Sequence, residues 1–91
     1  MNPLRLALTK HFKEEWHKWV GNGMTESKLK HALSGRLSSQ LRKGSRINRD
    51  GYLEIYFNRW IKVVLAPGNR GGWVAITVVT PEKKRERNKR G

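Results

Sequence analysis

Apolar side chains near the start of the chain follow a helical spacing. They recur at four-residue steps, at Leu4, Leu8, Phe12 and Trp16. Residues four apart lie on one face of a helix, so this spacing predicts an amphipathic helix that begins near Pro3. The glycine-rich stretch at residues 21–23 predicts its end, because glycine readily adopts the left-handed conformation that often stops a helix.

A second helix is expected after Thr25. The Thr25 hydroxyl is suited to capping a helix, and Glu26 in the first turn complements the helix dipole. The apolar stripe of this helix begins with Leu29, Ala32 and Leu33. The helix either stops at the Ser-Gly pair of residues 34–35 or continues through Leu37 and Leu41.

The second half of the chain is rich in aromatic and β-branched residues, which favour strands. Residues 52–66 are long for one strand, and the polar pair Asn58 and Arg59 predicts a tight hairpin that divides them. Residues 67–72 predict a turn, and residues 73–80 a further strand. We therefore expect an α+β fold in which two N-terminal helices pack on a small antiparallel sheet of three or four strands.

The length of 91 residues suits one domain, which we assign to residues 1–80. Residues 81–91 contain no apolar anchor, so we expect a disordered basic tail there. The chain carries 20 Lys and Arg against seven Asp and Glu, a net charge of +13. Residues 1–80 alone keep a charge of +9, so the domain itself predicts a polyanionic partner, with nucleic acid first and an anionic membrane second.

The residue types present exclude several kinds of site. The chain has no cysteine, only three histidines and no clustered carboxylates, so we expect no metal site. It also lacks a phosphate-binding loop motif and a serine nucleophile motif, and we expect no cofactor. No apolar run approaches the roughly 18 residues of a membrane span, so we expect a soluble protein. Of the two polyanionic partners we expect nucleic acid, and no membrane.

The remaining side chains suit the cleavage of RNA, which carries its own nucleophile in the 2′-hydroxyl group. Cleavage needs a base for that hydroxyl, an acid for the 5′-oxygen and cations beside the phosphate. Histidine can transfer the protons, and arginine and lysine can stabilise the charge. The sequence therefore allows a metal-independent ribonuclease that leaves a 2′,3′-cyclic phosphate.

Two segments resemble a known superfamily. Residues 8–33 read LTKHFKEEWHKWVGNGMTESKLKHAL, with a Thr-x-His start, a glycine-containing turn and a Met-Thr cap before a second helix. Residues 59–81 read RWIKVVLAPGNRGGWVAITVVTP, a hairpin that ends in a threonine-containing strand and a proline. Together they resemble the barnase–EndoU–colicin–RelE-like (BECR) ribonuclease toxins over about residues 8–81. The resemblance implies an RNA substrate, an acidic antitoxin or immunity protein as partner, and action in the cytoplasm.

The resemblance also implies four catalytic residues, namely His11, Arg59, Lys62 and Thr77. Thr80 is an alternative to Thr77 as the hydroxyl of the last strand. The family pattern usually has an arginine a few residues after the histidine. Here that region holds Lys13, Trp16 and His17 and no arginine. The residue that acts as general acid is therefore open, and His17 is a candidate for it.

Some of these residues have a structural interpretation as well. His11 shares a helix face with Leu8 and Trp19, so it is either a proton-transfer group or a packed core histidine. Glu54 is either a general base or one half of a cross-strand ion pair. Trp60 and Lys62 are two residues apart, so on a strand they would lie on the same face. An aromatic side chain beside a cation is typical of a surface on which bases stack.

The predicted nucleic-acid-binding residues are Arg46, Arg49, Trp60, Arg70, Lys83, Lys84 and Arg85. A ribonuclease toxin and a non-catalytic nucleic-acid-binding module would both use such a surface. A small regulatory protein that binds an acidic partner is a third interpretation. The sequence alone does not separate these functions.

Overall fold

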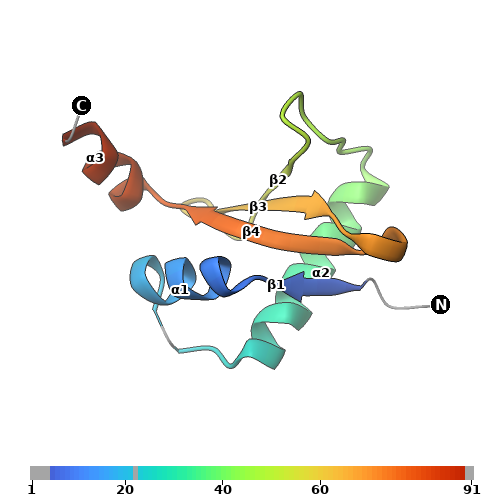
Figure 1. Cartoon of the computed structure of the whole chain (residues 1–91), viewed down its shortest axis with the longest axis horizontal. Coiled ribbons are helices and arrows are strands. Elements are labelled where there is room, and N and C mark those ends of the chain that lie inside the picture. Colours follow the sequence, from blue (N-terminus) through green and yellow to red (C-terminus); the bar gives the residue numbers. More distant parts are fainter. Residues whose placement is uncertain (1–4, 22, 90–91) are drawn as a thin grey trace.

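The computed structural model describes residues 5–21 and 23–89. In chain order its elements are β1 (Leu6–Leu8), α1 (Lys10–Trp19), α2 (Glu26–Arg42), β2 (Leu53–Tyr56), β3 (Lys62–Pro67), the 3-10 helix η1 (Asn69–Gly71), β4 (Trp73–Val79) and α3 (Pro81–Lys89) (Figure 1). None of the helices in these described ranges is both long and apolar enough to cross a bilayer.

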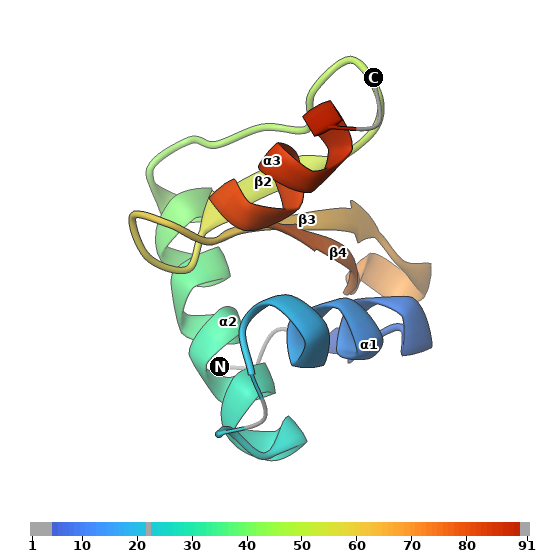
Figure 2. The ribbon, with the colours of Figure 1, turned by 90° about the vertical axis from the view of Figure 1, so that its left-hand side faces the viewer.

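The strands form one sheet in the order β1-β4-β3-β2. The pairs β2–β3 and β3–β4 are antiparallel, whereas β1 runs parallel to β4. A parallel pair needs a long connection, and here the chain passes through α1, α2, β2 and β3 between β1 and β4. Figure 2 shows α2 on one face of the sheet, and in both views α1 lies alongside β4. The predicted α+β class, with helices packed on a small sheet, is confirmed, but the sheet is mixed and not wholly antiparallel as predicted, because β1 runs parallel to β4.

The start of the first helix differs from the prediction. Residues 6–8 form β1, so Leu8 lies in a strand, and Pro3 and Leu4 lie outside the described residues. The helix begins at Lys10, where Thr9 caps it by accepting a hydrogen bond from the Phe12 amide at 3.0 Å. Residues 6–8 are extended because they pair with the edge of β4. The spacing of the apolar residues along the chain does not reveal this pairing.

The second helix continues to Arg42, so the longer of its two predicted ends is correct. The Thr25 hydroxyl accepts a hydrogen bond from the Lys28 amide at 3.2 Å, which confirms the predicted cap. Gly35 faces solvent, whereas Leu33 and Leu37 are completely buried on the opposite side. Burial of these leucines outweighs the cost of about 1 kcal/mol for a glycine inside a helix.

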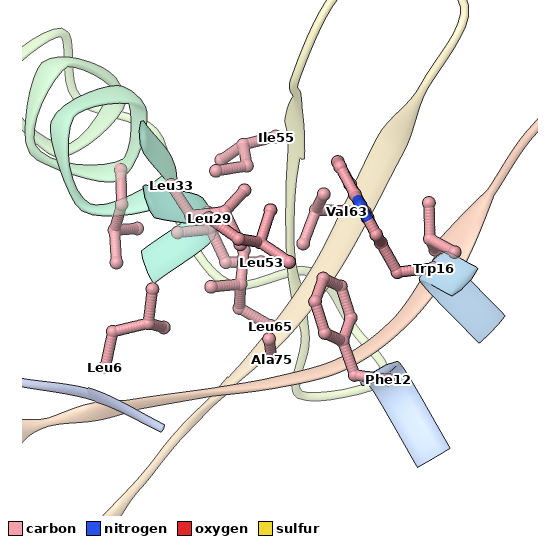
Figure 3. Close-up of a cluster of buried hydrophobic side chains, with 12 residues drawn as sticks. Leu6, Phe12, Trp16, Leu29, Leu33, Leu53, Ile55, Val63, Leu65 and Ala75 are labelled. Carbon is pink, nitrogen blue, oxygen red and sulfur yellow. The ribbon is translucent and has the colours of Figure 1, made fainter. Parts of the chain in front are cut away.

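The core lies between the sheet and the two helices α1 and α2 (Figure 3). Phe12 and Trp16 of α1 meet residues of the strands and of α2, which include Leu33, Val63 and Leu65. The Trp16 ring also packs edge-on against Phe57, with centroids 5.0 Å apart.

Side chains alternate between the core and the other face of the sheet. On that second face, here called the open face, lie Glu54, Tyr56, Lys62, Val64, Thr77 and Val79. Glu54 and Tyr56 are exposed, and the other four are half-buried.

The segment after β4 is helical, whereas the sequence predicted a disordered tail. Thr80 is 3% exposed and caps α3 by accepting a hydrogen bond from the Lys83 amide at 3.1 Å. Pro81 suits the first helical position, and Glu82 complements the helix dipole in the first turn. The prediction failed because it considered apolar anchors only, and this helix is held by a cap and by polar contacts of Lys83.

Candidate functional site

Four side chains from α1, β4 and α3 form a chain of polar contacts. His11 Nε2 lies 3.7 Å from Glu15 Oε1, and Glu15 Oε2 lies 3.6 Å from Lys83 Nζ. Lys83 Nζ in turn donates a hydrogen bond to Thr77 Oγ1 at 3.0 Å. We call these four residues the His11–Thr77 cluster.

The backbone explains how residues from both ends of the chain meet here. His11 and Glu15 are one turn apart on α1, so they share a face. The N-terminus of α1 is tied to β4, because the Thr9 hydroxyl donates a hydrogen bond to the Ala75 carbonyl at 2.9 Å. At the other end, the cap at Thr80 turns the chain into α3 and returns Lys83 toward Thr77.

A β-bulge sets the direction of Thr77. Leu65 pairs with Ala75, but the preceding Val64 pairs with Thr77, so Ile76 is an extra residue in β4. Without it, strict alternation would place Thr77 on the buried face with Ala75. The bulge therefore moves the Thr77 hydroxyl to the open face, where Lys83 reaches it.

The contacts of Lys83 determine what the Thr77 hydroxyl can do. An ammonium group has three donors, and two of them go to Thr77 Oγ1 and to the Val78 carbonyl, each at 3.0 Å. Because Thr77 Oγ1 accepts from Lys83, its own hydroxyl proton is available for another acceptor. Lys83 and Thr77 therefore present a cation and a polarised donor side by side, as an anionic ligand requires.

Exposure distinguishes the members of the cluster. The His11 side chain is 61% exposed, which excludes the interpretation of a packed core histidine. Glu15 and Lys83 are only 20% and 16% exposed. Glu15 Oε2 is buried and has no hydrogen-bond partner among the described residues, so Lys83 is the charge that compensates it.

The structure thus places two of the four predicted catalytic residues, His11 and Thr77, in one cluster. Lys83, predicted only as a nucleic-acid-binding residue, joins them, whereas Thr80 is buried as the cap of α3. Glu15 was missed. Its position four residues after His11 on a helix was the available signal.

Lys62 and Arg59 lie elsewhere. Lys62 Nζ is 3.1 Å from Glu54 Oε1 and 5.8 Å from the centre of the Tyr56 ring, which confirms the cross-strand ion pair predicted for Glu54. Arg59 is exposed in the turn after β2, where the sequence predicted a hairpin, so it does not share the strand of Lys62. The turn forms because Asn58 Oδ1 accepts hydrogen bonds from the amides of residues 60 and 61 at 2.8 and 2.9 Å.

The predicted nucleic-acid-binding residues lie on several segments. Arg46 and Arg49 are exposed in the loop between α2 and β2, and Lys84 and Arg85 are exposed on α3. Trp60 is 63% exposed, but it lies in the β2–β3 turn instead of alternating with Lys62 along a strand. Arg70 belongs to η1, and its side chain lies outside the described part of the structure.

The other two histidines are exposed on the helices, His17 on α1 and His31 on α2. His17 lies in a shallow surface depression with Lys10, Lys13 and Lys18. Within residues 5–21 and 23–89, no three His, Asp or Glu side chains come close enough to hold a metal ion.

Two solved structures share this fold. One is the solution structure of a conserved hypothetical protein from Helicobacter pylori, with a TM-score of 0.62 and 13% identity, over 89% of this chain and 98% of that one. The other is a copper-bound mutant toxin from Helicobacter pylori, with a TM-score of 0.51 and 16% identity, over 88% and 97% of the chains. No protein-family model matches the chain, and no curated protein matches its sequence. The likeness is therefore one of fold.

Proposed function

We propose that this protein is a ribonuclease toxin that cleaves RNA without a metal ion. The observation that carries the proposal is the solvent-exposed His11 imidazole at the end of the Glu15–Lys83–Thr77 contacts. A proton-transfer group is thus linked through the Glu15 carboxylate to a cation and a hydroxyl donor. The net charge of the chain is +13. The toxin from Helicobacter pylori that shares the fold supports the assignment to a toxin–antitoxin module.

In the proposed reaction His11 takes the proton from the 2′-hydroxyl group of the RNA. The 2′-oxygen then attacks the adjacent phosphorus and the bond from phosphorus to the 5′-oxygen breaks. The leaving 5′-oxygen takes up a proton from solvent, and the products are a 2′,3′-cyclic phosphate and a 5′-hydroxyl end. General-base catalysis of this kind contributes about 10²- to 10⁴-fold to a rate.

The other cluster members act on charge. The Thr77 hydroxyl and the Lys83 ammonium stabilise the non-bridging phosphate oxygens as negative charge develops. The Glu15 carboxylate faces the imidazole, so it attracts the imidazolium that forms when His11 accepts its proton. Arg59 binds phosphate outside the cluster, in the β2–β3 turn. Lys62 on the open face is held by Glu54 and binds phosphate only when that ion pair opens.

The remaining basic residues attract the RNA strand. Arg46, Arg49, Lys84 and Arg85 are exposed, and each phosphate contact releases counterions, which makes binding dependent on salt. A basic surface of this kind must be masked in the cell that makes the toxin. We infer an acidic antitoxin or immunity protein as partner, and the cytoplasm as the place of action.

Incubation of the purified protein with total RNA in the presence of EDTA tests the function. We expect cleavage by the wild type and by His31→Ala, a control that removes an exposed histidine of α2 with no proposed role, and a loss of about 10²- to 10⁴-fold in His11→Ala. RNA that stays intact with the wild type contradicts the enzyme. If intact RNA is also retarded in a gel shift that weakens with salt, the protein is a non-catalytic binding module.

A further inference from the structure

The backbone at Trp60 is held in place by hydrogen bonds, whereas the Trp60 side chain is exposed. It lies in the β2–β3 turn, where Asn58 Oδ1 accepts hydrogen bonds from the amides of Trp60 and Ile61. The turn is closed by the Phe57 amide, which donates to the Ile61 carbonyl at 2.8 Å. It is also anchored to α2, because Arg36 Nε donates to the Phe57 carbonyl at 2.8 Å and the Arg36 guanidinium lies 4.3 Å from the centre of the Phe57 ring.

An indole that is 63% exposed on such an anchored turn needs an explanation, because exposure of a large aromatic side chain is unfavourable. The core does not require Trp60, since the neighbouring Phe57 and Ile61 pack against it instead. An exposed indole on an anchored turn offers a flat apolar surface to a ligand, and tryptophan is enriched at binding surfaces.

Trp60 forms one wall of a pocket of about 460 Å³. The end of α1 and the start of α3 also line it. The other lining residues are Trp19, Val20, Asn58, Ile61, Thr80, Pro81, Glu82 and Arg85. The volume lies within the range of small-ligand sites. Lys18 covers one side of the Trp19 ring at 4.9 Å, so Trp60 provides the free aromatic surface.

The pocket adjoins the His11–Thr77 cluster along two elements. On α1, Trp19 follows Glu15 by one helical turn, a rise of about 6 Å. At the start of α3, Thr80 lines the pocket and its hydroxyl caps the amide of Lys83. Measured along α1, a ligand that reaches from Glu15 of the cluster to Trp19 of the pocket therefore spans about one helical turn.

We propose that this pocket binds a nucleobase of RNA, next to the phosphate held at the cluster, by stacking on Trp60. The assignment rests on the proposed function for the identity of the ligand. An aromatic wall suits the flat face of a base, and the exposed Arg85 at the pocket suits the adjacent backbone phosphate. A net charge of +13 favours a polyanion over an apolar peptide in this position.

Fluorescence anisotropy with a short labelled single-stranded RNA tests the pocket in a His11→Ala background, so that the RNA stays intact. We expect Trp60→Ala to weaken binding about 10-fold, because the base loses the aromatic surface on which it stacks. Trp60→Phe should retain most of the affinity. Tyr52→Ala is the matched control, since Tyr52 is another exposed aromatic residue that does not line the pocket.

Heparin is a second probe, a polyanion without bases. Trp60→Ala should bind heparin as tightly as its His11→Ala parent, which also shows that the variant is folded. Equal RNA affinity of Trp60→Ala and its parent overturns the pocket. An equal loss for RNA and heparin overturns it as well.

The two proposals fail separately. If the wild type cleaves RNA but Trp60→Ala does not change RNA binding, only the proposal for the pocket is overturned. If the wild type leaves RNA intact but its RNA binding depends on Trp60, only the proposal of catalysis is overturned.

Discussion

Lys83 of α3 lies 3.6 Å from Glu15 of α1, measured from Nζ to Oε2, and both side chains are largely shielded from solvent. This ion pair joins the C-terminal helix to the first helix across β4. It also links His11 to Thr77, because each of the paired residues contacts one of them. The pair is therefore at once a tether for α3 and the centre of the candidate site.

Glu15→Gln keeps the shape of the side chain and removes its charge. We expect a loss of about 1–2 kcal/mol in the free energy of unfolding, between the values typical of exposed and of buried pairs, because Lys83 is left without its counter-charge. RNA cleavage should fall roughly 10-fold, and amide exchange in α3 should become faster. Glu14→Gln is the control, because Glu14 is exposed on the same helix. Identical behaviour of the two variants would contradict the tether.

Thr77→Val removes the hydroxyl at nearly constant volume. If that hydroxyl donates to the phosphate, the cleavage rate should fall about 10²- to 10³-fold, as when a donor to a developing oxyanion is removed. Thr77→Ser retains the hydroxyl and should keep most of the activity. Single-turnover cleavage of a labelled RNA measures the rate. A valine variant with wild-type activity would remove Thr77 from the site.

Glu54→Gln releases Lys62 from its ion pair on the open face. We expect tighter RNA binding, with the salt dependence steeper by about 0.7 in the slope of log K against log salt, the value for one added contact to a single strand. Asp50→Asn removes the same charge from the exposed loop and serves as the control. Gel shifts at several salt concentrations measure both. An equal gain in RNA affinity for the two variants would show that only the net charge matters, and not the release of Lys62.

Thr9 and Thr25 both cap helices, but only Thr9 also donates a hydrogen bond to β4. Thr9→Ala should therefore cost about 2 kcal/mol of unfolding free energy, and Thr25→Ala about 1 kcal/mol. Urea denaturation followed by circular dichroism compares the two. A larger loss at Thr25 would show that the contact of Thr9 with β4 contributes little to stability.

The sequence predicted those features that depend on neighbours along the chain. The cap at Thr25 needs only the amide of Lys28, and the β2–β3 turn needs only Asn58 and the two amides that follow it closely. The alternation in β2 and the apolar stripe of α2 likewise follow from strand and helix periods. The identity of most elements, and the α+β class, could be read from these local signals.

The tertiary structure alone decided the features on which the candidate site depends. β1 is too short to show a period, and it forms because the edge of β4 is available for pairing. The bulge at Ile76 moves Thr77 to the open face, and a bulge changes register without a distinct sequence signal. Glu15 and Lys83 come from opposite ends of the chain, so only folding brings their charges together. His11 could be selected from the sequence as a candidate, but its exposure and its neighbours are set by contacts between distant segments.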